Sequence, residues 1–290
     1  MPAVTVPLRL VKMHSCGNDY VYLDAIGGPA LPPGVDVGRA AAELSDRHFG
    51  VGGDGLIILY RAPSGRLGMR MFNSDGSEGL MCGNGLRCLA AYAHAEGYSP
   101  EPRLEVETKA GLVRADVRLR PGPGGQFAVV TVDLGPPGEI RPREVTLGGD
   151  GFSPDPRTYQ GTYVFVGNPH FVVVVPDIVQ VALAAVGPAL ETHPVFPDRA
   201  NIEFVQVLSR SRLRMRVWER GSGITLACGT GAAASLVAAV AAGLADRRAS
   251  LVLDGGELEV EWPENASVLV TGPAIEVFRT TYTRPLPGPR

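Results

Sequence analysis

The chain lacks several features that mark common classes of protein. Its four cysteines form neither a Cys-x-x-Cys pair nor a zinc-like pattern with histidine, which argues against a zinc site and a disulfide framework. The formal net charge is only −3, whereas a nucleic-acid-binding surface needs clustered Lys and Arg. No uninterrupted apolar run reaches the roughly 18 residues that a membrane span needs. We therefore expect an ordinary soluble globular protein that binds no metal, nucleic acid or membrane.

Lysine is scarce, and no secretory signal is recognisable at the start of the sequence. Lys12 and Lys109 are the only lysines, and neither lies in a motif for a Schiff base. Residues 1–10 lack the basic start and apolar core of a secretory signal. We therefore expect a cytoplasmic protein whose cysteines are thiols rather than disulfides.

An internal repeat is the clearest feature that is present. Residues 66–85 and 212–231 share eight of twenty positions at a fixed offset of 146 residues. The matched segments include Cys82-Gly-Asn-Gly85 and Cys228-Gly-Thr-Gly231. At 290 residues, the chain has room for two domains of about 145 residues. The repeat indicates a duplicated domain with one cysteine at the same point of each copy.

Hydrophobic periodicity and turn residues predict the same order of elements in both halves. In the first half we expect helices at 37–47 and 86–96 and strands at 8–13, 20–24, 56–60, 68–72, 103–108 and 112–119. In the second half we expect helices at 181–190 and 232–244 and strands at 161–166, 170–175, 202–208, 212–218, 251–253 and 257–261.

A Pro/Gly-rich stretch at 120–125 is the best candidate for the domain boundary. We therefore assign residues 1–125 to the first domain and 126–273 to the second. The C-terminal segment 274–290 is expected to pack with the first domain.

The helices that follow the two cysteines are unusually apolar. The helix at 232–244 has no polar side chain apart from Ser235, and residues 86–95 are nearly as apolar. A helix without a polar face is buried all round. Each domain is therefore expected to wrap its strands around one central helix, with the cysteine just before the helix.

That location suits a cysteine that carries protons. A helix N-terminus lowers the pKa of a thiol, and its outward N–H groups can bind a carboxylate. One such cysteine would most simply be a small packing residue. Two at equivalent points of a repeat, with the glycines retained, favour a function for Cys82 and Cys228 as a pair of acid–base groups.

Other motifs are weaker. Gly50-Val-Gly-Gly-Asp-Gly55 matches a dinucleotide-binding pattern, but a helix precedes it and a strand follows, the reverse of what that turn requires.

Cys88 is expected to be a buried packing residue, and Cys16 an exposed bystander in a turn. His170 lies at a turn where it could tune a thiol. Glu219 and Arg220 can be interpreted either as a solvated ion pair or as ligands for a charged substrate.

At these residues the chain resembles the diaminopimelate epimerases, and the resemblance spans nearly its whole length. Five ordered motifs carry it: Met13-His-Ser-Cys-Gly-Asn-Asp19, Phe72-Asn-Ser-Asp-Gly-Ser-Glu78, Met81-Cys-Gly-Asn-Gly-Leu-Arg-Cys88, Gly167-Asn-Pro-His170, and Glu219-Arg-Gly221 with Ala227-Cys-Gly-Thr-Gly231. The resemblance implies an α+β fold of two pseudo-symmetric domains, each a mixed, mostly antiparallel sheet wrapped around a central helix. It also implies an active site in the cleft between the domains and a homodimer.

The activity that the resemblance implies is the interconversion of LL- and meso-diaminopimelate without a cofactor, leading to lysine and a peptidoglycan precursor. Carried over by motif, Cys82 and Cys228 are the proton-transfer residues, and His170 and Glu219 modulate their pKa values. The implied substrate ligands are Asn18, Asn73, Gly83, Asn84, Asn168, Asn201, Glu219, Arg220, Gly229 and Thr230.

The chain also departs from the family pattern. Ser15-Cys16 replaces the usual Gly-Leu, Ile224 replaces a glutamate, and Gly55 stands where some members have a glutamine. The nearest rival function is a proline or hydroxyproline racemase of the same architecture. The rival from another class is a catalytically silent amino-acid-binding protein or thiol sensor.

Overall fold

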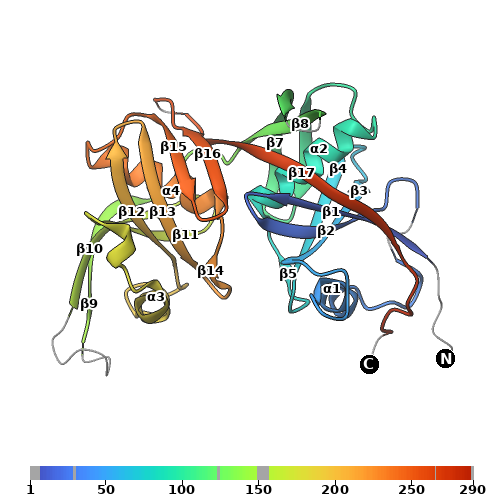
Figure 1. Cartoon of the computed structure of the whole chain (residues 1–290), viewed down its shortest axis with the longest axis horizontal. Helices are drawn as coiled ribbons and strands as arrows, with labels where there is room; N and C mark the ends of the chain where they lie inside the picture. The colour runs from blue at the N-terminus through green and yellow to red at the C-terminus, as the bar shows by residue number, and fades with distance from the viewer. Residues whose placement is uncertain (1–6, 29–30, 123–124, 149–156, 265, 289–290) are drawn as a thin grey trace. The chain divides into compact units, whose positions relative to one another are not determined.

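The computed structural model describes residues 7–28, 31–122, 125–148, 157–264 and 266–288 (Figure 1). The chain divides into two compact units: unit 1 comprises Met1–Val132 with Gly272–Arg290, and unit 2 comprises Asp133–Thr271. The Pro/Gly-rich stretch at 120–125 lies where β7 (Gly111–Gly122) gives way to β8 (Gly125–Asp133). The chain therefore crosses to unit 2 at the end of β8 rather than at that stretch.

Unit 1 is a mixed sheet around a helix. Its further elements are β1 (Leu8–Ser15), β2 (Asn18–Asp24), α1 (Val37–Ser45), β3 (Gly55–Arg61), β4 (Leu67–Asn73), β5 (Glu78–Gly79), α2 (Gly83–Ala95), β6 (Arg103–Thr108) and most of β17 (Leu269–Tyr282). The pairs β1–β2, β3–β4, β6–β7 and β1–β17 are antiparallel, and β2–β3 and β4–β6 are parallel. Helix α2 packs against β1, β2, β3 and β7, so the sheet curves around it.

Unit 2 repeats this plan. Its elements are β9 (Ile140–Leu147), β10 (Arg157–Phe165), β11 (Pro169–Val174), η1 (Ile178–Gln180), α3 (Leu183–Glu191), β12 (Asn201–Ser209), β13 (Arg212–Glu219), β14 (Gly223–Thr225), α4 (Gly229–Ala241), β15 (Arg248–Leu253) and β16 (Gly256–Glu261). The pairs β11–β12 and β13–β15 are parallel, as β2–β3 and β4–β6 are in unit 1. Helix α4 packs against β10, β11, β12, β13, β15 and β16.

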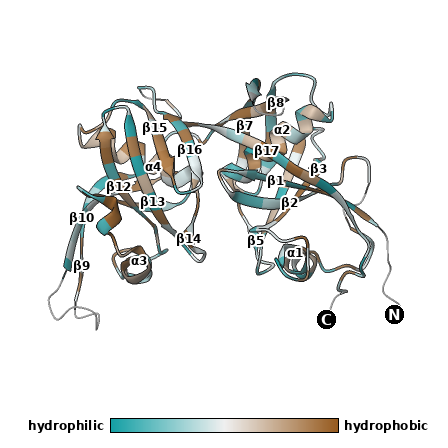
Figure 2. Cartoon of the chain, in the orientation of Figure 1, coloured by the Kyte–Doolittle hydropathy of each residue, from teal (hydrophilic) through white to brown (hydrophobic). Residues whose placement is uncertain are grey.

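The expected α+β fold of two pseudo-symmetric units is confirmed. Residues 83–93 of α2 and 231–239 of α4 are all buried, and those of α2 include the polar Asn84 and Arg87. Strands β12 and β13 carry both hydrophobic and hydrophilic residues (Figure 2), and both strands pack against α3 and α4. Removal of this apolar surface from water stabilises each unit separately.

The boundaries and the minor strands differ from the prediction. Both central helices begin three residues earlier than expected, directly after the cysteines, because the glycine-containing turns are themselves helical. The strands β5, β8, β9, β14 and β17 were not predicted. In β17, Gly272 and Pro273 normally mark a turn, but here the strand continues through them.

Candidate functional site

Cys82 and Cys228 are the N-cap residues of the two central helices. Both have extended backbones, with φ of −131° and −125°. The Sγ of Cys82 accepts a hydrogen bond from the Gly85 N–H at 3.4 Å, and that of Cys228 accepts one from the Gly231 N–H at 3.3 Å. Each thiol therefore lies at the positive end of a helix dipole, where a thiolate is stabilised.

The residues expected to hold a carboxylate are the first two of each helix. Gly83 and Asn84 open α2, and Gly229 and Thr230 open α4. The first N–H groups of a helix have no acceptor within it, so they can donate to an anion. Each unit therefore places a thiol and the first N–H groups of a helix at the same point.

In unit 1, two asparagine side chains connect to the thiol of Cys82. The Asn18 Oδ1 lies 3.4 Å from the Cys82 Sγ and also accepts a hydrogen bond from the Asn84 Nδ2 at 3.1 Å. Asn18 opens β2 and Asn84 lies in the first turn of α2. The structure thus brings together three of the residues that the sequence predicted for the site.

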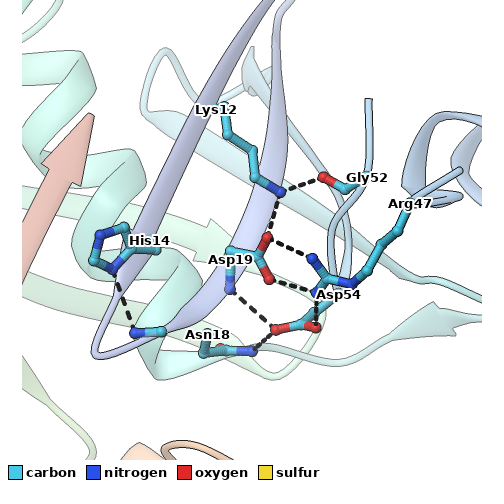
Figure 3. A network of polar contacts seen from close by, with 8 residues as sticks. Lys12, His14, Asn18, Asp19, Arg47, Gly52 and Asp54 are labelled. Carbon is cyan, nitrogen blue, oxygen red and sulfur yellow. Dashed lines mark hydrogen bonds and ion pairs between the residues drawn. The ribbon is translucent and has the colours of Figure 1, made fainter. Parts of the chain in front are cut away.

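A network of four charged side chains holds Asn18 in place (Figure 3). The Asn18 Nδ2 donates to the Asp54 Oδ2 at 2.7 Å, and the Asp19 N–H donates to the same oxygen at 3.0 Å. Arg47 binds both oxygens of Asp19, at 2.7 and 3.1 Å, and one of Asp54, at 2.8 Å. Lys12 adds an ion pair with Asp19 at 2.5 Å.

The charges of this network balance one for one. Burial opposes ionisation of Asp19, but Arg47 and Lys12 outweigh it and lower the pKa of Asp19 to about 2. Burial raises the pKa of Asp54. This network was not predicted from the sequence, because its residues are spread over 43 positions. Asp54 lies in the glycine-rich segment that was interpreted only as a possible dinucleotide motif.

Asn73 lies at the end of β4, opposite Gly55 in the β3–β4 register. Its Nδ2 donates to the Ser77 Oγ at 3.0 Å, which holds the side chain at the turn before β5. Asn73 therefore lies next to the start of β3, but its side chain is hydrogen-bonded within the turn between β4 and β5.

In unit 2, a buried pair of side chains lies beside the second thiol. His170 and Glu203 are both fully buried, and the His170 Nδ1 lies 2.7 Å from the Glu203 Oε1. The His170 Nε2 lies 2.8 Å from the Asn168 Oδ1. His170 thus connects the Gly167-Asn168 turn to β12. His170 and Asn168 were predicted from the sequence as site residues, but Glu203 was not.

Glu219 and Arg220 do not pair with each other. The Glu219 carboxylate accepts from the Thr225 hydroxyl, whereas the Arg220 Nη1 donates to the Asp198 carbonyl at 2.8 Å. The interpretation of Glu219 and Arg220 as a solvated ion pair was therefore wrong. The Arg220 N–H donates to the Asn201 Oδ1 at 2.9 Å, so Asn201 fixes the backbone that follows Glu219.

The surroundings of Cys228 disfavour its thiolate. Burial raises the pKa of Cys228 well above its ordinary value, and the carboxylates of Glu219 and Glu203 raise it further. Burial also raises the pKa of Glu219, to about 7. Glu219 therefore titrates in the range where an acid–base group is most effective, close to neutral pH.

The titration of Glu219 predicts a pH-dependent stability. The protonated form is favoured in the folded state, so its contribution is full below pH 4.5 and is lost as the pH rises through 7. Replacement Glu219→Gln mimics the protonated form. Relative to wild type, we expect its free energy of unfolding to rise by about 2 kcal/mol between pH 5 and pH 8.

Urea unfolding followed by fluorescence measures this difference, because both tryptophans lie in unit 2. The exposed Glu264→Gln in the same unit is the control and should show no such trend. A Glu219→Gln effect that stays constant across this pH range would contradict the assignment.

Strand registers show which residues of the two units are equivalent. Tyr20 faces Gly55 across β2–β3, and His170 faces Asn201 across β11–β12. The same registers place Ile57 and Glu203 at equivalent positions. A Cβ on Gly85 would lie 2.3 Å from the Ile57 Cδ1, and one on Gly231 would lie 2.7 Å from the Glu203 Oε1. Ile57 and Glu203 thus lie beneath the same turn of their helices.

The remaining cysteines are both buried. Cys88 is 1% exposed, as predicted, and burial raises its pKa to about 12. Cys16 is only 3% exposed, so the expectation of an exposed bystander was wrong. Its φ of +51° turns the side chain inward at the β1–β2 turn, whose geometry the sequence pattern does not reveal. Ile224 lies exposed on β14.

The residues that the structure describes lack two further features. Within those ranges, no group of three or more His, Cys, Asp or Glu side chains could hold a metal ion. In the same part of the chain, no helix is long and apolar enough to cross a membrane.

The fold is shared with solved structures of other proteins. A hydroxyproline epimerase from Agrobacterium vitis matches with a TM-score of 0.68 and 17% identity, covering 97% of this chain and 94% of that one. A phenazine biosynthesis protein of the PhzF family from Bacillus anthracis matches with a TM-score of 0.67 and 15% identity, covering 96% and 99%. These likenesses define the class of fold.

Sequence similarity then identifies the family within that class. The diaminopimelate epimerase family model matches residues 10–138 and 162–277. Diaminopimelate epimerases from Moorella thermoacetica and Bacteroides thetaiotaomicron are 44% and 43% identical over 284 and 276 residues. The alignments cover 95% of this chain and 99% and 98% of those proteins. The chain belongs to the diaminopimelate epimerase family.

Proposed function

We propose that this chain interconverts LL- and meso-diaminopimelate by a two-base mechanism without a cofactor. The observation that carries the proposal is the presence of a thiol at the N-cap of both central helices, Cys82 and Cys228, in a chain of this family. Inversion of a carbon that bears hydrogen needs one base and one acid on opposite faces, and two equivalent thiols supply both.

In the proposed reaction, one cysteine starts as a thiolate and the other as a thiol. The thiolate removes the α-proton, and the electron pair of the broken C–H bond remains on the carbon. The other thiol then gives its proton to the opposite face. The product has the inverted configuration, and the two cysteines have exchanged protonation states.

The helix ends supply the stabilisation that this carbanion requires. The N–H groups of Gly83, Asn84, Gly229 and Thr230 are proposed to bind the α-carboxylate, onto which the negative charge of the carbanion spreads. Pre-oriented donors at a site that excludes water act most strongly on charge that develops during the reaction. In the proposed mechanism, these N–H donors stabilise the carbanion in place of a cofactor that withdraws electrons.

The polar side chains around the two thiols are proposed as substrate ligands, and they differ between the units. Asn18 and Asn73 would contribute from unit 1, and Asn168, Asn201, Glu219 and Arg220 from unit 2. The Arg220 guanidinium can bind a carboxylate through two parallel hydrogen bonds. Because the substrate has a second amino acid end, these unequal sets would hold that distal end in one orientation.

Assembly and location are part of the proposal. We infer a homodimer from the family, with the exposed Phe278 on β17 as a candidate contact. We also infer that the protein works in the cytoplasm, because the mechanism needs both thiols reduced and that compartment keeps them so.

Deuterium incorporation tests the proposed function. We expect the protein to exchange the α-hydrogen of LL-diaminopimelate with solvent deuterium and to convert it to the meso isomer, both detected by NMR. Proline and hydroxyproline serve as matched alternatives, and they should show no exchange. Exchange with proline alone would assign the chain to the racemases, and no exchange with any of the three would favour a silent binding protein.

A further inference from the structure

Arg87 carries a positive charge into the core of unit 1. It lies in α2, five residues after Cys82, and is 0% exposed. Its Nε and Nη2 donate to the Ser15 Oγ at 3.1 and 3.0 Å, and its Nη2 also donates to the Asn84 Oδ1. Among the described residues, its Nη1 has no hydrogen-bond partner. Both partners are neutral, so the guanidinium is buried without a carboxylate bound to it.

A buried cation is costly unless an anion lies near it. The groups whose negative charge would act on Arg87 are Cys16, Cys88, Cys82 and Tyr22. Burial raises the pKa of Cys88 to about 12 and that of Tyr22 well above its ordinary value, so both are neutral at neutral pH. Cys16 is buried and does not cap a helix. Cys82 is partly exposed and does, so its thiolate is the anion that best fits Arg87.

Arg87 also determines the orientation of the amides next to the thiol. A guanidinium only donates hydrogen bonds, so the Asn84 Oδ1 must face it and the Asn84 NH2 must face Asn18. The Asn18 Oδ1 then faces the thiol, and its NH2 faces Asp54. The chain of hydrogen bonds from Arg87 to Asp54 therefore has a single direction.

Two contacts in unit 1 act against a thiolate. The Cys82 S–H can donate to the Asn18 Oδ1 only while it is protonated. Asp54 brings a carboxylate next to Asn18, but Arg47 and Lys12 neutralise the Asp19–Asp54 pair. A weak S–H···O hydrogen bond is a minor effect compared with a full charge in a medium of low dielectric constant. Arg87 and the helix end therefore outweigh the opposing contacts.

Unit 2 has carboxyl groups near its thiol where unit 1 has a guanidinium. The residue equivalent to Arg87, at the offset of 146, is Ala233. Glu203 replaces Ile57 beneath the helix, and Glu219 lies beside Cys228. His170 also lies in this group, but its side chain is hydrogen-bonded to Glu203. Carboxylates, rather than a cation, therefore surround the second thiol.

We propose that Arg87 is a positioning residue that sets the proton distribution of the substrate-free enzyme, with Cys82 as the thiolate and Cys228 as the thiol. The proposal rests on the two-thiol function proposed above. Its consequence is that the free enzyme is ready for the substrate isomer whose α-hydrogen faces Cys82. The reverse direction first requires the proton to move from Cys228 to Cys82.

The pH dependence of alkylation tests this proposal. The intact protein is treated with iodoacetamide across a pH series, and peptide mass spectrometry measures the rate at each cysteine. The pH at which the alkylation rate is half its maximum, the midpoint, reports the ionisation of the thiol. The accessibility of the thiol affects only the maximal rate. In the wild type, we expect the midpoint of Cys82 to lie at least about one pH unit below that of Cys228.

Matched variants separate charge from structure. Arg87→Met should raise the Cys82 midpoint by about one pH unit or more, and Arg87→Lys, which keeps the charge, should raise it less. Neither should move the Cys228 midpoint. Glu203→Gln should lower the Cys228 midpoint and leave that of Cys82 in place. A purely structural role would lower the melting temperature without moving either midpoint.

Two results would overturn the proposal. One is a wild-type Cys228 midpoint at or below that of Cys82, which needs no variant and so decides the question even if Arg87→Met fails to fold. The other is a folded Arg87→Met protein with an unchanged Cys82 midpoint. Alkylation needs no substrate, so shifted midpoints without deuterium exchange would refute the proposed function but not the charge distribution.

Discussion

Replacement of either Cys82 or Cys228 by serine is expected to lower the rate of epimerisation by at least about a thousandfold. A positioned acid–base group contributes roughly 10² to 10⁴ to a rate, and the hydroxyl of serine does not ionise near neutral pH. Each variant lacks the group that serves one face of the substrate carbon. Because turnover needs both faces, either loss should stop the reaction in both directions.

Serine separates this loss from an effect on folding. Cys82 and Cys228 accept hydrogen bonds from the Gly85 and Gly231 N–H groups, and serine is a preferred N-cap residue that can keep them. The melting temperatures should therefore stay close to that of the wild type. Cys88→Ser, which changes a buried thiol outside the proposed mechanism, is the control for activity. Normal turnover by Cys82→Ser or Cys228→Ser would refute the two-base mechanism.

Gly55→Ala is expected to destabilise unit 1 by about 3 kcal/mol or more, the upper end of the cost of an overpacked site. A Cβ at this position would lie 2.1 Å from the Phe72 carbonyl oxygen and 2.9 Å from the Tyr20 ring. The first of these is a backbone atom of the adjacent strand, so the clash cannot be relieved by rotating a side chain. Relief requires β3 to move away from β4.

Gly28→Ala is the matched control, because a Cβ there would have no atom within 4 Å. Its stability should differ from that of the wild type by less than about 0.5 kcal/mol. Urea unfolding should be followed by circular dichroism, since both tryptophans lie in unit 2 and would not report on unit 1. Equal unfolding midpoints for the two variants would contradict the argument.

The same clash limits which residue can occupy position 55. Gly55 starts β3, and the strand registers place it between Tyr20 and Asn73. No side chain fits there with the present backbone. The segment before it contributes instead through Asp54, whose carboxylate orients Asn18.

The sequence predicted much of the fold because its signals are local. The apolar helices after Cys82 and Cys228 could only be buried, and periodicity placed the main strands that surround them. The edge strands β5 and β14 are two and three residues long, too short to show a period. The long strand β17 was missed because Gly272 and Pro273 resemble a turn.

The environment of each thiol could not be predicted in the same way. The repeat and the motifs identified Cys82 and Cys228, but Asp54, Glu203 and Arg87 became relevant only when the folded chain placed them. Asp54 approaches Asn18 across 36 residues, and Glu203 approaches His170 across 33. Contacts over such separations depend on strand register, which a single sequence does not specify.

By itself, the sequence determined that two copies of one domain each carry a thiol before a buried helix. Hydrophobic pattern and repetition are properties of the order of residues and need no tertiary structure. Only the tertiary structure decided that these thiols lie among different titratable groups. Arg87 contributes a buried cation near Cys82, and Glu203 and Glu219 contribute carboxylates near Cys228. The reason is that the effect of a charge depends on its distance and burial, and both are properties of the folded chain.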